Sequence, residues 1–478
     1  MLIWGVNESA HDAALSVVKD GEILFAAHSE RYSKIKNDWY LNDMIIEDAL
    51  KYGEPDKIAY YEKRALKTLR IITRGGRFGK RPYLREHKLG NTKWEEFSHH
   101  YSHACAGYFT SSFDDATIVV LDAIGEFNTT TIWSGKGNKV TQLYKQNYPF
   151  SFGLFYSAFT HLIGLKPNQE EYIMMGMAAY GNPYRYLEKV RQYFPNTQKQ
   201  KYNFHKGIKD WDEPILEQDR FDIAASVQVV YTERLCEFMH FARKIGESKN
   251  LVFMGGCSLN CSANTVLWGI FDDIWIMPNP GDAGSSLGAA LAIHGNKVQW
   301  SGPYLGHDLN NEYPVSQIIR SLKEDSVVPV ASGRAEFGPR AFGNRSILAD
   351  PRDPKIKDKV NLIKKRELFR PFAPVVLEED AHLWFDMPCK SAPYMQYAVR
   401  CLKPDSIPAV VHYDGTSRVQ TVNENEHSGL YAVLQEWKKT TGIGVLLNTS
   451  LNIKNQPLLN DGDDIDAWEE TYLTRICR

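Results

Sequence analysis

One order of strands and turns occurs twice in this chain. In the first copy, an apolar run at residues 2–6 leads into a polar turn at residues 7–12, and two further strand-like runs are joined by an Asp-Gly turn. In the second copy, an apolar run at residues 117–121 leads into a polar turn at residues 122–126, and two more strand-like runs are joined by a glycine turn. Such turns between apolar runs are typical of β-hairpins. Two copies of a β-rich unit, separated by helical patterns, predict a duplicated mixed α/β domain.

This repeat resembles the duplicated architecture of actin, the sugar kinases and Hsp70. In that architecture, the turn after the first strand of each half faces the phosphates of a bound nucleotide. The resemblance implies that His11 and Asp12, in the first turn, lie at a catalytic site. It also implies that Gly125, in the second turn, lies against a nucleotide.

Two glycine-rich segments later in the chain are typical of loops that hold phosphates. A strand-like run at residues 251–254 ends at Gly255-Gly256, and a loop at residues 281–284 enters a helical pattern. Small residues in such loops let the backbone approach a ligand, although ordinary turns are the alternative. Together with Gly125, we expect these residues to bind a nucleotide: Gly255, Gly256, Asn260, Gly281, Gly284 and Ser285.

Composition and the positions of Gly and Pro predict the domain organisation and the compartment. Residues 299–311 are rich in Gly, Pro, Asn and His, so we predict two domains, over residues 1–304 and 305–478. No apolar run approaches the ~18 residues of a membrane span. Residues 1–12 lack a basic start, and the seven cysteines are scattered through the chain. We therefore expect a cytoplasmic protein without a membrane partner.

A pair of histidines gives the sharpest local signal. His99 and His103 lie four residues apart in a helix expected over residues 94–108, so their rings share one face. Asp122 follows at the end of a predicted strand. Two imidazoles and a carboxylate can bind a divalent metal, and open coordination positions suit Fe(II). Packing histidines are the alternative, because HxxxH pairs also arise by chance.

Basic residues concentrate in Gly- and Pro-rich loops of the second domain. Guanidinium groups match the geometry of phosphate and carboxylate, so we expect an anion site there, with surface charge as the alternative. The residues are Arg340, Arg345, Lys364, Arg366, Arg370 and Arg418.

A second basic stretch lies at residues 63–93, with eleven Lys or Arg and one acidic residue, Glu86. The chain as a whole has a net charge of -2, so global charge does not mark a nucleic-acid binder. Aromatic residues are interleaved in the stretch, as in surfaces that contact nucleic acid. We hypothesise that Arg77, Lys80 and Arg81 bind a polyanionic or nucleotide acceptor, and a solvated loop is the alternative.

Motifs spread over the whole chain resemble those of the O-carbamoyltransferases, a family that includes nodulation and antibiotic-tailoring enzymes. EYIMMGMAAYG at residues 171–181 is similar to the family pattern E-Y-K-x-M-G-L-A-x-Y-G, and residues 255–264 are similar to G-G-x-x-L-N-C-x-A-N. EFGPRAFGNRSILADP at residues 336–351 has Phe342 where the family has Leu. Further matching segments are His11-Asp12, Asp20-Gly21, Glu30-Arg31, residues 99–104, Asp122, RELFRPFAP at 366–374, DGTSRVQTV at 414–422 and NTSLN at 448–452, where Leu451 replaces Phe.

The resemblance implies a two-domain enzyme with an actin-like first domain, similar to tRNA threonylcarbamoyl-transferases, and a YrdC-like second domain. In such enzymes carbamoyl phosphate and ATP form carbamoyladenylate, and the carbamoyl group passes to a hydroxyl. The resemblance adds Asp282 to the metal ligands and adds Ser417 and Asn448 to the carbamoyl phosphate site. Iron is the expected metal, with magnesium or manganese as alternatives. His11 is the expected base for the acceptor hydroxyl.

Two other functions remain open on an actin-like fold, namely a small-molecule kinase and a nucleotide-binding regulatory protein. The Arg-rich motifs of the second domain argue against a simple kinase. For the transferase, the acceptor alternatives are a sugar, an antibiotic, a nucleotide and a hydroxymethylated DNA base, because acceptor loops are where relatives differ. An oligomer remains an alternative to a monomer.

Overall fold

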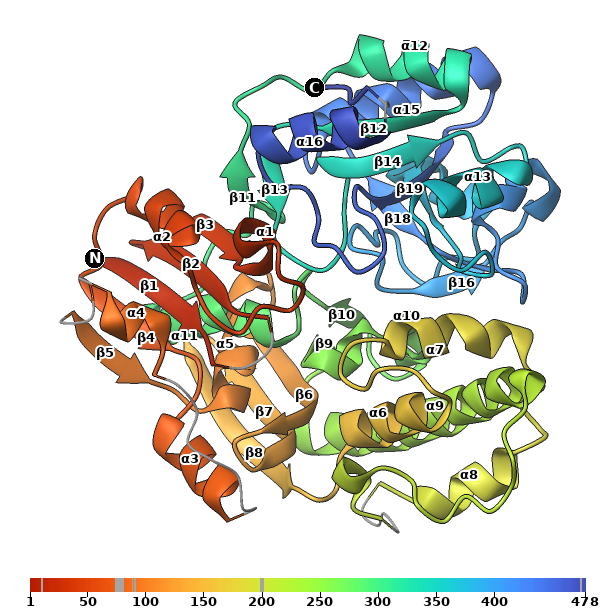
Figure 1. The fold of residues 1–478 in the computed structure, drawn as a ribbon. Helices are drawn as coiled ribbons and strands as arrows, with labels where there is room; N and C mark the ends of the chain where they lie inside the picture. Colours follow the sequence, from red (N-terminus) through yellow and green to blue (C-terminus); the bar gives the residue numbers. More distant parts are fainter. Residues whose placement is uncertain (10–11, 74–80, 88, 90–91, 198–201, 473–474) are drawn as a thin grey trace.

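The computed structural model describes residues 1–9, 12–73, 81–87, 89, 92–197, 202–472 and 475–478. Two five-stranded sheets with the same strand order lie in the first part of the chain (Figure 1). The first has the order β3-β2-β1-β4-β5, with β1 (Leu2–Asn7), β2 (Ala14–Lys19), β3 (Glu22–His28), β4 (Lys57–Tyr60) and β5 (Lys93–Glu96). The second has the order β8-β7-β6-β9-β10, with β6 (Asp115–Gly125), β7 (Asn128–Lys136), β8 (Lys139–Asn147), β9 (Asn250–Met254) and β10 (Asp273–Trp275).

The two sheets also share their strand directions. β1 pairs antiparallel with β2 and parallel with β4, while β6 pairs antiparallel with β7 and parallel with β9. This identity confirms the duplicated, actin-like mixed α/β fold that the sequence repeat predicted. It also places the ends of β1 and β6 at corresponding positions in the two halves. The turn predicted at residues 122–126 is wrong in its bounds, because β6 continues to Gly125 with a register shift after Leu121.

Helices α5 (His99–Thr110) and α11 (Ser285–His294) lie between the two sheets (Figure 1). α11 packs on β1 and β2, α5 packs on β6 and β9, and the helices pack on one another. A Cβ atom on Gly288 would lie 1.8 Å from the carbonyl oxygen of Ser102, so only glycine permits this approach. The close pairing fixes the N-terminus of α11 relative to α5.

Other helices cover the outer faces. α6 (Phe152–Leu162) and α9 (Glu217–Gly246) pack on the second sheet, and α2 (Asp43–Leu50) packs on β2 of the first. The remaining helices of this part are α1 (Glu30–Ser33), α3 (Arg64–Ile72), α4 (Tyr83–Glu86), α7 (Glu171–Met177), α8 (Leu187–Tyr193) and α10 (Cys261–Asn264).

A third five-stranded sheet forms the second part of the molecule. Its order is β12-β14-β19-β15-β18, and it is mixed because only β15 and β18 pair in parallel. Side chains alternate between its faces, so Leu348 and Leu446 pack into one hydrophobic core and Ile347 and Leu447 into another. Its strands are β12 (Val327–Ala331), β14 (Arg345–Ala349), β15 (Ala373–Leu377), β18 (Gln420–Val422) and β19 (Val445–Ser450).

Two short strand pairs and five helices complete this part. The pairs are β11 (Tyr304–Asp308) with β13 (Arg334–Glu336), and β16 (Ala398–Arg400) with β17 (Thr416–Arg418). The helices are α12 (Val315–Asp325), α13 (Lys355–Ile363), α14 (Ala381–Trp384), α15 (Ser428–Thr441) and α16 (Gly462–Tyr472). The YrdC-like identity of this part and the boundary between residues 304 and 305 stay predictions.

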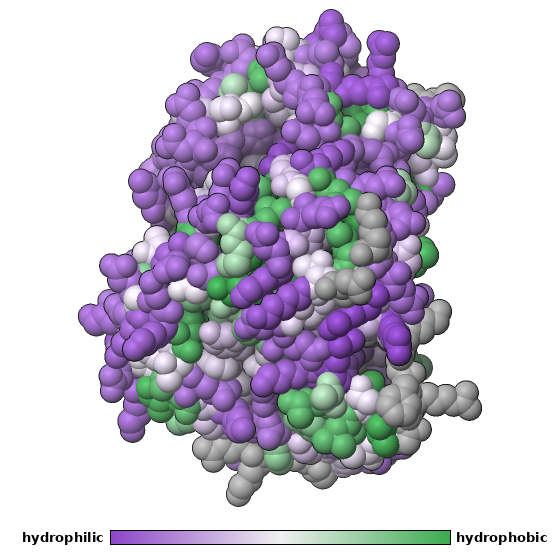
Figure 2. Space-filling model, turned by 90° about the vertical axis from the view of Figure 1, so that its left-hand side faces the viewer, coloured by the Kyte–Doolittle hydropathy of each residue, from purple (hydrophilic) through white to green (hydrophobic). Residues whose placement is uncertain are grey.

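One expected element is wrong at its start. The helix expected over residues 94–108 begins only at His99, because residues 93–96 form β5 and extend the first sheet. The face of the molecule in Figure 2 is mainly hydrophilic, with separate hydrophobic patches. Among the described residues, no helix combines the length and apolar character needed to cross a bilayer.

Candidate metal centre and anion site

Four side chains from three elements converge between the two halves of the first part. α5 contributes His99 and His103 one turn apart, the end of β6 contributes Asp122, and the short turn before α11 contributes Asp282. The Nε2 atoms of the two histidines are 3.2 Å apart, and each lies 3.1–3.4 Å from Asp122 Oδ2 and Asp282 Oδ1. The four residues together are called the metal centre below.

The residues of the metal centre fit a divalent cation. All four ligand atoms lie within 4.8 Å of one another. Donors that share a first-row metal at about 2.0–2.2 Å lie about 3 Å apart, so the observed spacing fits. Both histidines are buried, and the side chains of Asp122 and Asp282 are only 12% and 11% exposed. Two imidazoles and two carboxylates suit iron(II), manganese or zinc better than calcium.

The charges of the metal centre offset one another. Burial lowers the pKa of His99, but the carboxylates of Asp282 and Asp122 outweigh this effect and hold the pKa well above its ordinary value. Burial and the Asp282 charge raise the pKa of Asp122, but hydrogen bonds from both histidines outweigh them and hold it well below the ordinary range. The centre therefore pairs two bases with two acids, and a metal ion would replace the protons held between them.

Two neighbouring residues fix the orientation of His99. The Glu126 Oε1 atom accepts two hydrogen bonds from backbone N–H groups, one of 3.1 Å from His99 and one of 2.8 Å from Lys63. A Cβ atom on Gly125 would lie 2.3 Å from Cδ2 of the His99 ring. Gly125, expected to bind a nucleotide, is therefore needed here because a larger residue would displace the ring. Neither role was predicted, although both residues lie in the second turn of the repeat.

Of the other glycine-rich residues, Gly255 and Gly256 lie beside the metal centre. Gly255 has a φ of +91°, and a Cβ atom there would lie 2.1 Å from the carbonyl oxygen of Leu121. Gly256 lies beside Asp122, since its Cβ position is 3.3 Å from Oδ1. Of the remaining predicted residues, Gly281 faces open space, Gly284 packs on Asn279, Ser285 begins α11, and Asn260 caps α10 through its side chain. The N-terminus of α11 beside Asp282 can attract an anion.

The first turn follows the end of β1. Asp12 has a φ of 64°, and its carbonyl oxygen accepts a hydrogen bond of 3.1 Å from Asn7 Nδ2. His11, the expected base, lies outside the described residues. The turn is held at both ends, because Ser9 and Ala13 donate backbone hydrogen bonds of 2.8 Å to residues 38–39.

Five of the predicted basic residues gather in the second part, and we call them the cationic basin. Burial and the neighbouring Arg418 lower the pKa of Arg340 to about 9, and burial together with Arg366 and Arg370 lowers the pKa of Lys364 well below its usual range. Among the described residues, one acidic side chain is paired with the basin. It is that of Glu367, whose Oε2 atom lies 3.7 Å from Arg370 Nη1. The basin members are Arg340, Lys364, Arg366, Arg370 and Arg418.

Several basin groups keep binding capacity. Arg340 has one hydrogen bond among the described residues, 3.3 Å long, to the carbonyl oxygen of Leu259, and Arg418 Nε is buried without a hydrogen bond. By contrast, Lys364 Nζ donates to oxygens of Ser450 and Asn452, so it is already held by the loop after β19.

Asn448 has an unused hydrogen-bonding atom, whereas the hydroxyl of Ser417 already donates to the backbone. Both donor hydrogens of Asn448 are used, by the carbonyl oxygen of Ala341 at 3.1 Å and by Gln420 Oε1 at 2.6 Å. Its Oδ1 atom is buried and has no partner, so it can accept a hydrogen bond from an amide. Ser417 Oγ donates to the carbonyl oxygen of Val410 at 2.8 Å, and the residue is fully buried.

Arg345 does not fit the predicted anion site. It is fully buried, and its two terminal nitrogens donate to backbone carbonyls on three segments of chain. Its contacts include Ser332 at 2.9 Å and Asn460 at 2.9 Å. Arg345 therefore holds loops together, and it is not part of the cationic basin.

Arg81 lies beside a hollow that it lines with Tyr40, Tyr83 and Glu86. Glu86 places an acidic group on the same wall, so this hollow is not uniformly basic. Arg77 and Lys80, the other two residues expected to contact an acceptor, lie outside the described residues.

One short segment, residues 255–261, connects the metal centre to the cationic basin. Gly256 lies beside Asp122 of the metal centre. Three residues later, the carbonyl oxygen of Leu259 accepts from Arg340, and the Cys261 thiol lies beside Arg418. The sequence marked this segment for its glycines but gave no sign that it reaches both sites.

Comparisons with known proteins agree on one family. The model described as carbamoyltransferase N-terminus matches residues 59–291, and the model described as carbamoyltransferase C-terminus matches residues 319–475. The nodulation protein NolNO of Sinorhizobium fredii is 31% identical over 98% of this chain and 77% of its own. An uncharacterised protein of Synechocystis is 32% identical over 97% of this chain and 93% of its own.

One further relative and one solved structure were also matched. The 3'-hydroxymethylcephem-O-carbamoyltransferase of Amycolatopsis lactamdurans is 29% identical over 96% of this chain and 95% of its own. The crystal structure of full-length HypF in its phosphate- and nucleotide-bound form aligns with a TM-score of 0.39 and 13% identity, over 61% of this chain and 46% of that chain. The fold assignment therefore rests on the strand order of this chain.

Proposed function

Because this chain belongs to the carbamoyltransferase family, we propose that it uses ATP and carbamoyl phosphate to carbamoylate a hydroxyl group. One observation carries the proposal: a metal centre and a cationic basin occur in the same chain, and residues 255–261 contact both. Two linked sites suit a reaction with two chemical steps and a labile intermediate.

We assign the first step to the cationic basin. Carbamoyl phosphate and ATP both carry phosphate groups, and half-buried guanidinium groups without an acidic partner bind such anions strongly. Arg340 has one hydrogen bond among the described residues, and Arg418 Nε has none, so both keep donors for an anion. The free Oδ1 atom of Asn448 would accept a hydrogen bond from the carbamoyl amide. Water would release phosphate from carbamoyl phosphate, and the resulting carbamate would attack the α-phosphorus of ATP and displace pyrophosphate. The product of this step would be carbamoyladenylate.

We assign the second step to the space between the metal centre and the first turn. A metal held by His99, His103, Asp122 and Asp282 would neutralise phosphate oxygens and stabilise developing charge there. The proposed base, His11, would take the proton from the acceptor hydroxyl as its oxygen attacks the carbamoyl carbon of carbamoyladenylate and AMP leaves. Asp12 would support this turn. Iron(II) is the proposed metal, with magnesium or manganese as alternatives.

The acceptor and the compartment are also proposals. The acceptor would be a sugar, an antibiotic, a nucleotide or a hydroxymethylated DNA base, contacted by Arg77, Lys80 and Arg81. Reversing the charge of these three residues should raise the Michaelis constant of a polyanionic acceptor and leave that of ATP unchanged. A reduced, cytoplasmic setting is supported by the cysteines, because all seven lie in the described residues and none forms a disulfide.

The test of the first step needs no acceptor. The protein is incubated with ATP and carbamoyl phosphate, and carbamoyl phosphate-dependent release of pyrophosphate is measured. Release that is lost in Arg418→Ala but kept in Arg400→Ala, an exposed arginine on β16, would support the proposal. The acceptor is then sought by mass spectrometry with a panel of hydroxyl compounds.

The rival functions give other outcomes. Transfer of phosphate from ATP to a hydroxyl compound without carbamoyl phosphate would identify a kinase. Binding of ATP without release of pyrophosphate, with or without an acceptor, would favour a regulatory protein.

A further inference from the structure

The Glu30-Arg31 pair, which matches a family motif, has no role in the steps above. Arg31 lies on α1, and its guanidinium is 2% exposed. Nη2 donates a hydrogen bond of 2.7 Å to the carbonyl oxygen of Gly338, and Nη1 donates to that of Glu336, 305 residues along the chain. A planar guanidinium that grips two carbonyls fixes the direction of the backbone between them.

Glu336 closes the same loop from inside. Its Oε1 atom accepts hydrogen bonds from the backbone N–H groups of Phe342 at 2.8 Å, Asn344 at 2.9 Å and Arg345 at 3.2 Å. The loop over residues 336–345 is therefore held on both limbs, by Arg31 on the outgoing limb and by Glu336 on the returning one. Arg340 of the cationic basin lies between these two anchors.

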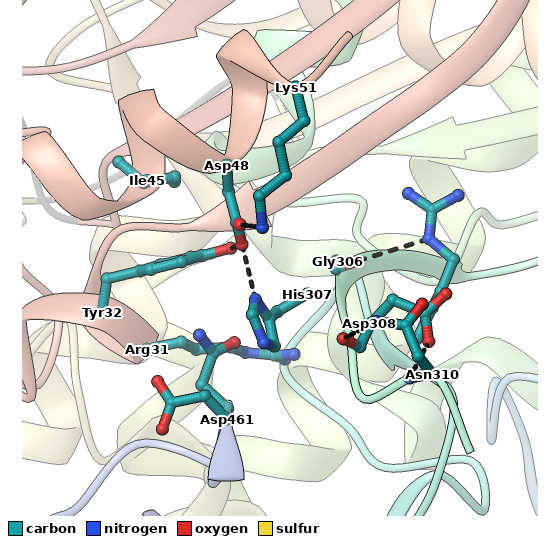
Figure 3. A network of polar contacts seen from close by, with 12 residues as sticks. Arg31, Tyr32, Ile45, Asp48, Lys51, Gly306, His307, Asp308, Asn310 and Asp461 are labelled. Atoms are coloured by element: carbon teal, nitrogen blue, oxygen red, sulfur yellow. Dashed lines mark hydrogen bonds and ion pairs between the residues drawn. The ribbon is translucent and has the colours of Figure 1, made fainter. Parts of the chain in front are cut away.

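The helix that carries Arg31 is itself anchored. Tyr32, the next residue, donates a hydrogen bond of 2.7 Å from its hydroxyl to Asp48 Oδ2 on α2. His307 Nδ1, on β11, lies 2.7 Å from the same oxygen, and Lys51 donates to the other oxygen. Figure 3 shows Tyr32, Lys51 and His307 pointing at Asp48, with Arg31 beside His307. Arg31 therefore reaches the loop from a fixed base.

Arg340 cannot hold its own position. It has one hydrogen bond among the described residues, and Arg418 repels it. We propose that Arg31 is a positioning residue for the carbamoyl phosphate site, because it holds the 336–345 loop so that Arg340 is aimed into the cationic basin. This inference rests on the proposed function, since it takes the basin as the carbamoyl phosphate site. It makes that site depend on a residue from the first part of the chain.

The expected loss of anion affinity depends on how often the 336–345 loop is in the conformation that aims Arg340 into the basin. If the loop adopts the aimed conformation for only a fraction of the time, the apparent affinity for the anion falls by that fraction. A loop that is aimed one tenth of the time would bind about tenfold more weakly. The metal centre contains no residue of this loop, so metal content should not change.

Arg334 offers a matched control. It also joins the two parts of the chain, because its Nη2 atom donates to the carbonyl oxygens of Leu24 and Leu305 at 2.6 Å. Among the described residues, its side chain forms no hydrogen bond with residues 336–345. Arg334→Met therefore removes a similar connection without releasing the Arg340 loop.

The experiment uses Arg31→Met, Arg31→Lys and Arg334→Met in the full chain. Amide hydrogen exchange over residues 336–345 and the affinity for inorganic phosphate, by calorimetry, are measured without turnover. We expect Arg31→Met to raise exchange and to weaken phosphate binding about tenfold, Arg31→Lys to restore part of the affinity, and Arg334→Met to match wild type in both. In turnover, Arg31→Met should raise the Michaelis constant of carbamoyl phosphate and leave that of ATP unchanged.

Two results would overturn the inference. One is unchanged exchange or unchanged phosphate affinity in Arg31→Met. The other is an equal loss in Arg334→Met, which would make Arg31 only a connection between the two parts. A wild-type protein that binds phosphate in this Arg31-dependent way but releases no pyrophosphate would contradict the proposed function and leave the positioning role standing.

Discussion

The metal centre and the cationic basin have opposite charge balance. In the metal centre, two buried histidines face two carboxylates, and each acid raises the pKa of its neighbouring base. In the basin, burial and neighbouring basic side chains lower the pKa values of Arg340, Lys364, Arg366 and Arg418. Among the described residues, one acidic side chain, that of Glu367, is paired with the basin. The first site is balanced without a ligand, and the second is not.

We infer from this difference that the basin is the site adapted for an anion. A protein tolerates buried like charges only at a cost in stability, and an anionic ligand removes that cost. Mutations should therefore have opposite effects at the two sites. Loss of one partner from the metal centre leaves an unpaired buried charge, whereas loss of one arginine from the basin relieves repulsion.

The largest effect is expected at the metal centre. His103→Ala removes a ligand atom that lies within 3.4 Å of the other three, so most of the bound metal should be lost. Elemental analysis of the purified variant measures this. His100→Gln is the matched control, because that ring contacts Thr131 through Nδ1. Metal content in His103→Ala equal to that of the control would contradict the ligand assignment.

In the basin, Arg418→Ala should raise the Michaelis constant of carbamoyl phosphate roughly 100-fold, since a charged hydrogen bond contributes about 1.5–3 kcal/mol. ATP affinity, measured by calorimetry, should stay near wild type, because we place further nucleotide contacts at the glycine-rich segments. Collapse of ATP binding with carbamoyl phosphate use intact would reverse this division of labour.

A smaller effect is expected from Gly125→Ala. The new methyl group would lie 2.3 Å from the His99 ring and would turn it away from the other ligands. Metal affinity should fall about tenfold, as it does when groups that orient a ligand are lost. Competition with a chelating dye measures the affinity. Gly269→Ala is the control, because its Cβ would meet no atom within 4 Å, and equal affinities in the two variants would refute the packing argument.

The smallest effect concerns stability and has opposite signs at the two sites. Without phosphate or metal, Arg340→Met should raise the free energy of unfolding by about 1 kcal/mol, because it removes a half-buried charge that has no acidic partner among the described residues. Asp122→Asn should lower it, because His99 and His103 each lose a partner. Urea unfolding at pH 7 measures both changes. A loss of stability in both variants would remove the contrast between the sites.

Local patterns predicted much of the fold and one of the two sites. The strand and turn repeat predicted the paired sheets, because a period of two residues and an Asp-Gly turn are local features. The four-residue spacing of His99 and His103 predicted their shared face for the same reason. The first strand after the basic stretch was missed, since Trp94 and its neighbours also suit a helix and only pairing with β4 decides between them.

Those local patterns could not predict contacts between residues that are far apart in the sequence. Arg345 and Arg340 lie in one motif and have the same chemistry, but backbone carbonyls surround only Arg345. Arg31 and Gly338 meet across more than half of the chain. Asp282 was placed with the histidines by family resemblance, because no spacing relates a residue on another element to α5.

The segment over residues 255–261 has a consequence for protein engineering. Its beginning packs against Asp122, and its end reaches Arg340 and Arg418. A chimera that takes its first part from one relative and its second part from another would have to keep the length of this segment unchanged. Because residues 256–259 form a short 3-10 helix, a single deleted residue would shift one end by about 2 Å. That displacement exceeds the tolerance of a hydrogen bond, so the segment limits where two carbamoyltransferases can be recombined.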